Sequence, residues 1–290
     1  MPKVVYVVLG SSGFVGSNLR LLLQERADLA SYFPPWQDAI VDLSAIVDEH
    51  PATTILLIDL AWPNVGASSS TGAASPERTG WASYVDWLGS MLTYIRRHEA
   101  IHYIGVGTGI ERYADEVPPL LDEPYRTYAM RKRWVSGEAS RVLGGRAHWR
   151  RMHFLFGPRE QQKRFVPSAI RACHTGEYLS LNVPERKRHW LHISDAAAGL
   201  LASADPELPQ CCDVTGREAI SFDALCDLIE KNVGGKLRRR QTGTTADARC
   251  LLVEPEHVAP VMPAQTGSVE QLSRRIREYD LWLHSQGKPI

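Results

Sequence analysis

The sequence has few cysteines, no long apolar run and no excess of charge of either sign. Its 290 residues include five cysteines, an odd number without a CxxC pair, so neither a disulfide framework nor a metal site is indicated. No apolar run reaches the roughly 18 residues of a membrane-spanning helix. Lysine plus arginine equals aspartate plus glutamate at 33 each. We therefore expect no membrane association and no nucleic-acid partner.

The N-terminus also lacks the basic region, apolar helix and small-residue cleavage site of a secretory signal. Together with the cysteine pattern, this predicts a cytoplasmic, reduced protein. A hydrophobic content of 44% is ordinary for a globular chain. The length suffices for one large α/β domain, or for a dinucleotide-binding domain with a smaller one.

Short apolar runs alternate with helical patterns in the first half of the chain. Residues 4–9, 53–61 and 101–106 are apolar runs typical of buried parallel strands. Residues 84–98 and 127–143 have the periodicity of amphipathic helices. Strands that alternate with helices predict an α/β fold, here a Rossmann-type doubly wound parallel sheet.

Past about residue 158 the alternation weakens. Helices are predicted at residues 165–174, 195–204, 221–233 and 271–284, the third with Ser221 as its N-cap. We therefore expect a dinucleotide-binding domain over residues 1–157, to which some later segments return. A smaller, mainly substrate-binding domain is expected over residues 158–290.

Two segments have no regular pattern. Residues 63–80 are rich in Gly, Ser, Ala and Thr, which predicts a mobile loop, either a surface insertion or a flap over a substrate. The basic cluster Arg238-Arg239-Arg240 is interpreted as a solvated edge in preference to a binding patch.

A glycine-rich turn, Gly10-Ser11-Ser12-Gly13-Phe14-Val15-Gly16, follows the first strand. In such a turn the first glycine makes the tight bend, the second lets backbone N–H groups approach a pyrophosphate, and the third allows close helix–strand packing. The positive end of the helix dipole adds to the attraction. The residues predicted to line a cofactor site here are Gly10, Ser12, Gly13, Phe14, Val15 and Gly16. The alternative is a glycine turn without a ligand.

Tyr128 and Lys132 are four residues apart on the predicted helix 127–143, so phenol and ammonium share one face. A cation beside a tyrosine favours the phenolate and brings its pKa from about 10 closer to neutrality. This pairing suits proton transfer to or from a carbonyl or alcohol oxygen.

The GxxGxxG turn and the YxxxK helix together resemble the short-chain dehydrogenase/reductase superfamily. The run 13–19, Gly-Phe-Val-Gly-Ser-Asn-Leu, resembles its extended branch, the NAD-dependent epimerase/dehydratase family. The resemblance implies an NAD(P)-dependent oxidoreductase in which Thr108 and Tyr128 hold the substrate carbonyl. Tyr128 then donates the proton, and Lys132 binds the nicotinamide ribose. For Thr108, the alternative is a hydroxyl that caps its own turn.

The same resemblance implies further cofactor contacts. Asp42 and Leu43 look like the pair that borders the adenine, and Leu60, Ala61 and Trp62 look like the strand end that passes the ribose. NAD-binding relatives place an acid after the second strand, whereas residues 27–37 offer no convincing acid or arginine. This favours NADPH slightly over NADH. A homodimer is implied by the resemblance alone.

For the substrate, residues 151–158 (Arg-Met-His-Phe-Leu-Phe-Gly-Pro) resemble the Arg-x-Phe-Asn-x-Tyr-Gly-Pro segment of nucleotide-sugar enzymes, with Phe154 in place of the Asn near the substrate. Arg188 matches the arginine that binds the diphosphate of a nucleoside-diphosphate sugar. An ordinary surface arginine is the alternative.

Residues 108–110 are Thr-Gly-Ile, without the acid pair of dehydratases. This leaves reduction or epimerisation, which the catalytic residues do not separate. The short region 27–37 resembles the spacing of nucleotide-sugar 4-ketoreductases, and this resemblance implies a 4-ketoreductase for a nucleoside-diphosphate 4-keto-6-deoxyhexose, in deoxysugar biosynthesis. The alternatives are an NAD-dependent epimerase, a reductase of a non-sugar ketone and a non-catalytic dinucleotide sensor.

Overall fold

The computed structural model describes residues 4–63, 77–114, 123, 125–202, 208–242 and 268–286. The chain forms two compact units. The first contains Met1–Arg151 with Ala204–Cys212, and the second contains Met152–Ser203 with Asp213–Ile290. The sequence predicted a boundary after residue 157. Most of the predicted loop 63–80 lies outside the described residues, and its last four residues belong to a helix.

The first unit is built on a six-stranded sheet with the order β2-β1-β3-β4-β5-β9. Its strands are β1 (Val4–Leu9), β2 (Ala30–Tyr32), β3 (Thr54–Asp59), β4 (Ile101–Thr108), β5 (Ala147–Met152) and β9 (Cys211–Val214). β1 runs parallel to β2 and β3, and β3 runs parallel to β4. The strand order reverses between β1 and β3, which is the switch point of a doubly wound sheet. The predicted Rossmann-type fold is therefore confirmed.

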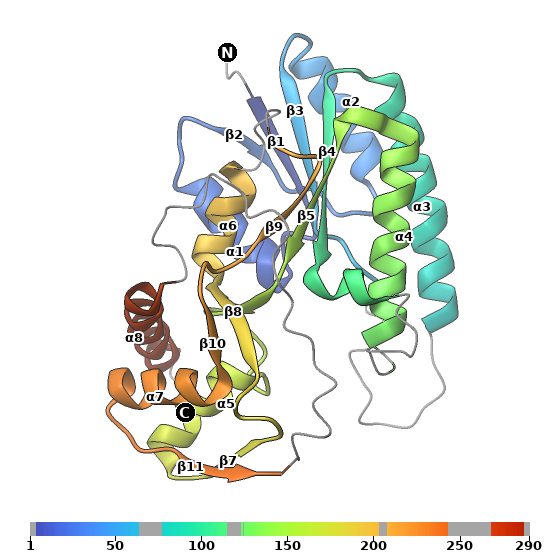
Figure 1. Cartoon of the computed structure of the whole chain (residues 1–290). Coiled ribbons are helices and arrows are strands. Elements are labelled where there is room, and N and C mark those ends of the chain that lie inside the picture. Colours follow the sequence, from blue (N-terminus) through green and yellow to red (C-terminus); the bar gives the residue numbers. More distant parts are fainter. Residues whose placement is uncertain are drawn as a thin grey trace. The chain divides into compact units, whose positions relative to one another are not determined.

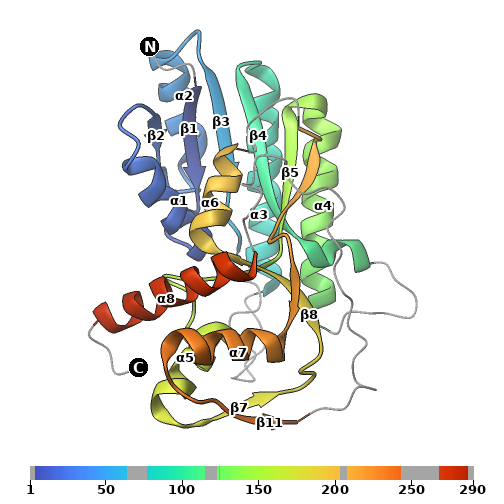
Figure 2. The ribbon, with the colours of Figure 1, turned by 60° about the vertical axis from the view of Figure 1, so that its left-hand side comes forward.

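The helices of the first unit are α1 (Phe14–Gln24), α2 (Ala39–Glu49), α3 (Glu77–Arg97) and α4 (Tyr125–Leu143). The short strand β2 and helix α2 were not predicted. β2 has only three residues, whereas α2 does carry a helical pattern, with Ala39, Leu43 and Ile46 buried on one face. α3 and α4 lie side by side (Figures 1 and 2). Val7, Leu57 and Tyr103 form one row across neighbouring strands and are almost completely buried. That burial explains why these strands are continuous apolar runs.

The second unit has a three-stranded sheet, β10-β8-β6, and a two-stranded sheet, β11-β7. The strands are β6 (Phe154–Phe156), β7 (Tyr178–Leu181), β8 (Lys187–His192), β10 (Ala219–Ser221) and β11 (Arg238–Gln241). The helices are α5 (Phe165–Thr175), α6 (Ile193–Ala202), α7 (Phe222–Val233) and α8 (Val269–Ser285). The predicted N-cap of α7 is confirmed, because the Ser221 hydroxyl accepts the N–H of Ala224 at 3.0 Å.

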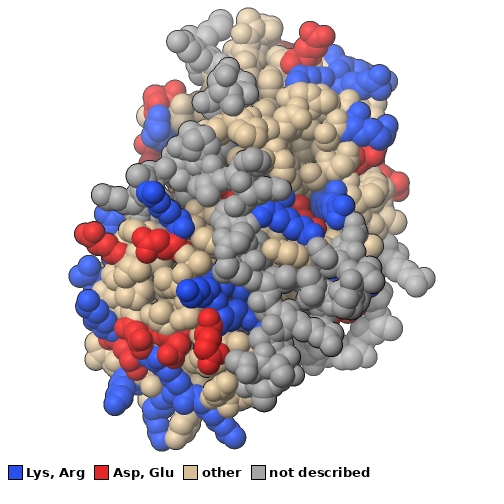
Figure 3. Space-filling view, in the orientation of Figure 1, with Lys and Arg blue, Asp and Glu red and all other residues tan. Residues whose placement is uncertain are grey.

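The basic cluster of residues 238–240 lies in β11, and two of its three arginines have local partners. Arg239 forms ion pairs with Asp223, Asp227 and Glu230, with N–O distances of 2.6, 2.6 and 3.0 Å. The Arg238 guanidinium lies 4.1 Å from the ring centroid of Tyr178. Acidic and basic side chains are interspersed on the face shown in Figure 3. These contacts support the interpretation of a solvated edge. No described helix is long and apolar enough to cross a membrane.

Candidate active site

The glycine turn between β1 and α1 is packed so tightly that two of its glycines have no room for a side chain. Gly10 has a φ of +71°, and a Cβ there would lie 2.6 Å from the backbone of Leu60. A Cβ on Gly16 would lie 2.1 Å from the carbonyl oxygen of Gly10. Gly13 is exposed and precedes the first residue of α1. The first N–H groups of a helix have no partner within it, so this turn can bind an anion.

Lys132 lies on α4 and is almost completely buried. Its ammonium donates to the carbonyl oxygen of Val106 in β4 at 2.7 Å, two residues before Thr108. Burial lowers the pKa of Lys132 to about 8, and the carboxylates of Asp59 and Glu111 oppose this shift because they attract the charged form. The ammonium is thus held at the end of β4 with a pKa close to the physiological range.

Trp62 contacts both Lys132 and Tyr128. Its indole ring is 3.9 Å from Lys132 Nζ, measured to the ring centroid, and meets the ring of Tyr128 edge to face at 5.5 Å. Tyr128 is half-buried on the same helix as Lys132. The spacing of four residues therefore places both groups against one aromatic side chain that follows β3.

Thr108 ends β4 and begins the short 3-10 helix η1 (Gly109–Tyr113). It forms a capping box with Glu111, in which the Thr108 side chain accepts a backbone N–H and the Glu111 carboxylate accepts the Thr108 N–H at 2.6 Å. Thr108 therefore does cap its own turn, as the alternative interpretation of this residue expected. A hydroxyl that accepts one hydrogen bond can still donate its own proton, so capping and carbonyl binding are compatible.

Glu111 is a buried acid that no sequence motif indicated. Its second oxygen accepts the indole N–H of Trp149 at 2.9 Å, and burial raises the pKa of Glu111 while the Thr108 N–H and Trp149 oppose the rise. A Cβ on Gly107 would lie 2.2 Å from this carboxylate. Gly107 thus makes room for an acid whose hydrogen bonds fix the end of β4.

Asp59, the last residue of β3, is a second buried acid, and its charge acts on Lys132. It accepts hydrogen bonds from the Tyr103 hydroxyl at 2.7 Å and from the Ala61 N–H at 3.0 Å. Burial raises its pKa, while Tyr103 and the charge of Lys132 lower it. In the sequence, Asp59 is visible only as an acid at the end of an apolar strand. Its role can be recognised only when its contacts with Tyr103 and Lys132 are known.

The remaining residues expected to line the cofactor lie directly after β3 and inside α2. Leu60 and Ala61 follow β3 beside the glycine turn, as the close approach of Gly10 to Leu60 requires. Asp42 and Leu43 lie inside α2, which begins at Ala39. Asp42 is partly exposed, but Leu43 packs in the core and has no exposed surface to offer a ligand.

An arginine from α1 lies beside the end of β2, where the sequence offered no cofactor-selecting residue. The Arg20 guanidinium is 5.1 Å from the ring centroid of Phe33, the residue that follows β2. Arg20 is exposed. Sequence reasoning missed it because only the window 27–37 was considered, whereas the fold brings α1 to that window.

The two predicted substrate residues of the second unit contact each other. The Arg188 guanidinium lies 4.8 Å from the ring centroid of Phe154, as expected for neighbouring strands β8 and β6. Arg188 is 5% exposed and donates to the Lys187 carbonyl oxygen at 2.7 Å. It is therefore not the ordinary surface arginine of the alternative interpretation.

A doubly wound sheet with a glycine turn after its first strand is the arrangement of Rossmann-type folds, and here the YxxxK helix α4 packs beside β4. Residues 75–208 match the model of the NAD dependent epimerase/dehydratase family. This segment contains Thr108, Tyr128, Lys132 and Arg188, and it begins after the glycine turn. No curated protein sequence is a significant match to the chain.

Solved structures of nucleotide-sugar epimerases and a dehydratase are similar to nearly the whole chain. UDP-N-acetylglucosamine 4-epimerase from Methanobrevibacter ruminantium M1 has a TM-score of 0.66 at 17% identity, over 99% of this chain and 100% of that one. UDP-glucose 4-epimerase from Thermotoga maritima gives 0.66 at 14% identity, over 98% and 99%. dTDP-glucose 4,6-dehydratase from Bacillus anthracis str. Ames, solved with NAD, gives 0.63 at 14% identity, over 97% of each chain.

The resemblance predicted from the sequence is therefore confirmed. Residues 75–208 resemble the NAD dependent epimerase/dehydratase family, and the fold is shared with solved nucleotide-sugar epimerases and dehydratases. The expectation of an oxidoreductase-type enzyme agrees with these neighbours, which include a dehydratase solved with NAD and an NAD-dependent NDP-hexosamine 5,6-dehydratase.

Proposed function

We propose that this chain reduces the keto group of a nucleoside-diphosphate 4-keto-6-deoxyhexose with NADPH or NADH. The observation that carries the proposal is the position of the Tyr128–Lys132 pair. The Lys132 ammonium donates to β4 two residues before Thr108, and Trp62 contacts both members of the pair. A phenol and an ammonium on α4, which packs beside the strand that ends at the Thr108 hydroxyl, suit proton transfer to a carbonyl oxygen.

The residues of the first unit fit a dinucleotide. The exposed Gly13 at the start of α1 suits a pyrophosphate, since Gly10 and Gly16 keep the turn close to the sheet. Leu60 and Ala61 suit the ribose. Lys132 uses one of three N–H groups on Val106, so the same ammonium can donate to ribose hydroxyls. A reduced nicotinamide, when bound, supplies two electrons and one hydrogen to the carbonyl carbon.

The protein side chains handle the carbonyl oxygen. The Thr108 hydroxyl donates to this oxygen and orients it. Tyr128 donates its phenolic proton as negative charge develops there, so the ketone becomes an alcohol and the phenolate regains a proton from solvent. The positive charge of Lys132 favours the phenolate that remains. Each proton transferred in these reaction steps therefore comes from a named group or from solvent.

The surroundings of Thr108 favour reduction over dehydration. Elimination of water needs an acid and a base next to the reacting carbons. Gly109 and Ile110 carry no ionisable group, and Glu111 is bound by the Thr108 N–H and Trp149. Its carboxylate is thus engaged in holding the end of β4.

The position of Arg20 supports the preference for NADPH. A guanidinium beside the end of the second strand suits the 2′-phosphate of NADPH, and Arg20 lies over Phe33 at that place. NADH is the alternative, since the dehydratase from Bacillus anthracis was solved with NAD. For the substrate, the buried Arg188 on Phe154 suits a diphosphate. A cytoplasmic homodimer is part of the same proposal.

An NAD-dependent 4-epimerase is the second candidate, and the similarity to two 4-epimerases favours it. An epimerase oxidises and re-reduces one carbon, so it turns over without net use of dinucleotide. The test is incubation with NADPH or NADH and a panel of dTDP, UDP, GDP and CDP 4-keto sugars, with the product and the oxidised dinucleotide measured. Formation of one molecule of oxidised dinucleotide for each molecule of alcohol product supports the reductase.

Tyr128→Phe provides the control variant. It should abolish turnover and leave dinucleotide binding unchanged, because the phenol donates the proton and the turn binds the pyrophosphate. Turnover retained in this variant would overturn the proposed mechanism. Interconversion of sugar epimers without net oxidation of dinucleotide would replace the reductase by the epimerase.

A further inference from the structure

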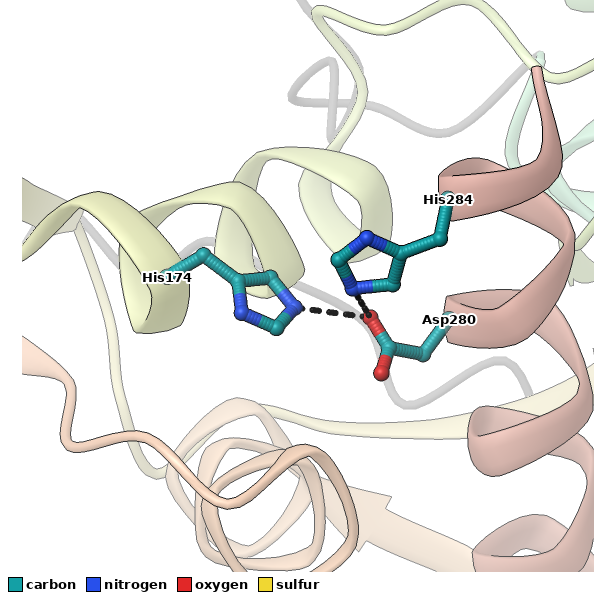
Figure 4. A group of neighbouring side chains, drawn as sticks. All are labelled: His174, Asp280 and His284. Atoms are coloured by element: carbon teal, nitrogen blue, oxygen red, sulfur yellow. Dashed lines mark hydrogen bonds and ion pairs between the residues drawn. The ribbon is translucent and has the colours of Figure 1, made fainter. Parts of the chain in front are cut away.

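Three metal-ligating side chains meet between two helices of the second unit. His174 lies in the last turn of α5, and Asp280 and His284 lie four residues apart on α8. Figure 4 shows both imidazole rings turned toward the same carboxylate. His174 and Asp280 are separated by 106 positions in the sequence, so no local motif indicated this cluster.

The ligand atoms converge on one point. The Nε2 atoms of His174 and His284 lie 2.8 Å and 3.7 Å from the same oxygen, Oδ1 of Asp280. The available ligand atoms all lie within 4.8 Å of one another. The two imidazole rings are 4.8 Å apart at an angle of 75°, so they do not stack and their nitrogens can face a common centre.

These separations are close to those that a zinc ion needs. Ligand nitrogens and oxygens lie about 2.0–2.2 Å from zinc, so two of them in a tetrahedral site are roughly 3.4 Å apart. The distance from His284 to Asp280 already meets this requirement. The contact of 2.8 Å between His174 and Asp280 is a hydrogen bond, which an ion would replace after a small lengthening.

The cluster is accessible, yet its central ligand is held in place. The side chains of His174 and His284 are 26% and 52% exposed, whereas that of Asp280 is 13% exposed. The neighbouring residues Tyr279 and Leu283 anchor this turn of α8 in the core. The carboxylate thus has a fixed position, and an ion and its waters can enter from solvent.

We propose that His174, Asp280 and His284 form a binding site for a divalent transition metal, best suited to Zn²⁺, that joins the end of α5 to α8. Two imidazoles and one carboxylate are ligands that zinc accepts, and water completes the four positions. The same set is poor for Mg²⁺ and Ca²⁺, which prefer oxygen ligands. The site does not depend on the proposed reductase activity.

The test is metal binding by the full chain without an added polyhistidine tag. Zn²⁺ is titrated against a chromophoric chelator, and Co²⁺ is followed by its visible absorption, which reports tetrahedral coordination. We expect one equivalent of Zn²⁺ per chain, an intense Co²⁺ spectrum, and a rise of the melting temperature with Zn²⁺ but not with Mg²⁺. The rise follows because an ion that binds only the folded chain stabilises it.

Variants assign the binding to this cluster. His174→Ala, Asp280→Asn and His284→Ala should each weaken Zn²⁺ binding at least about 10-fold, since removing even an outer-shell partner of a ligand costs that much. The matched control is His98→Ala, a histidine of the first unit that contacts Tyr94, which should leave binding unchanged. Zn²⁺ binding that survives in all three variants, or no binding by the unaltered chain, overturns the proposal.

Discussion

The Lys132 ammonium lies over the indole ring of Trp62, with Nζ 3.9 Å from the ring centroid. The same indole meets the ring of Tyr128 at 5.5 Å. Attraction between a cation and an aromatic face favours the charged form of the lysine. One side chain that follows β3 therefore influences the charge of Lys132 and the position of Tyr128 together.

Replacement of Trp62 should change both properties. Trp62→Leu removes the aromatic face, and a desolvated cation–π contact contributes about 2 kcal/mol, so the pKa of Lys132 should fall by roughly one unit or more. The alkaline limit of kcat should move to lower pH, and kcat itself should fall. Trp62→Phe keeps an aromatic face and should retain most activity. An unchanged pH profile for Trp62→Leu would contradict this role.

Asp59→Asn tests the electrostatic support of Lys132. The Asp59 carboxylate raises the pKa of Lys132 against the effect of burial. Without that negative charge the pKa should fall below its value of about 8, so the ammonium is lost at a lower pH. The alkaline limit of kcat should therefore shift down by about one pH unit.

The matched control for this shift is Tyr103→Phe. It removes the hydrogen bond of 2.7 Å to Asp59 and keeps the carboxylate. Its alkaline limit should move much less than that of Asp59→Asn. Equal shifts in the two variants would mean that Asp59 acts through its hydrogen bonds and not through its charge.

Two glycines of the turn should respond differently to a methyl group. Gly16→Ala places Cβ 2.1 Å from the Gly10 carbonyl oxygen, so the free energy of unfolding should fall by about 1–3 kcal/mol or more. On Gly13 the Cβ lies at an ordinary 3.4 Å and φ is −72°. Gly13→Ala should therefore keep the melting temperature but weaken dinucleotide binding, because it obstructs the approach of a pyrophosphate. Normal binding by Gly13→Ala would count against the cofactor site.

Arg20→Ala tests the choice of cofactor. If Arg20 binds the 2′-phosphate, its loss should cost about 1.5–3 kcal/mol, which is roughly a 10- to 100-fold rise in Kd for NADPH. The Kd for NADH should stay the same. Arg26→Ala removes another exposed arginine, which pairs with Asp28, and should change neither. Equal losses for both dinucleotides would remove Arg20 from the selection of the cofactor.

Much of the first unit could be predicted because its signals are local. The buried strands β1, β3 and β4 appear as apolar runs, and α4 appears as a helical pattern. β2 was missed because a three-residue strand has too few positions for a pattern, and α2 was missed although Ala39, Leu43 and Ile46 lie on one helical face. The Asp42–Leu43 pair, which resembles the pair that borders the adenine, lies inside α2.

The sequence alone determined the glycine turn and the spacing of the Tyr128–Lys132 pair. Gly16 is required by the backbone of Gly10 in the same turn, and the interval from Tyr128 to Lys132 is about one turn of a helix, so both depend on neighbours along the chain. The tertiary structure alone decided that Trp62 contacts the pair, that Asp59 and Glu111 act on Lys132, and that His174 meets Asp280. Those contacts join distant segments, and which segments meet depends on how strands and helices pack.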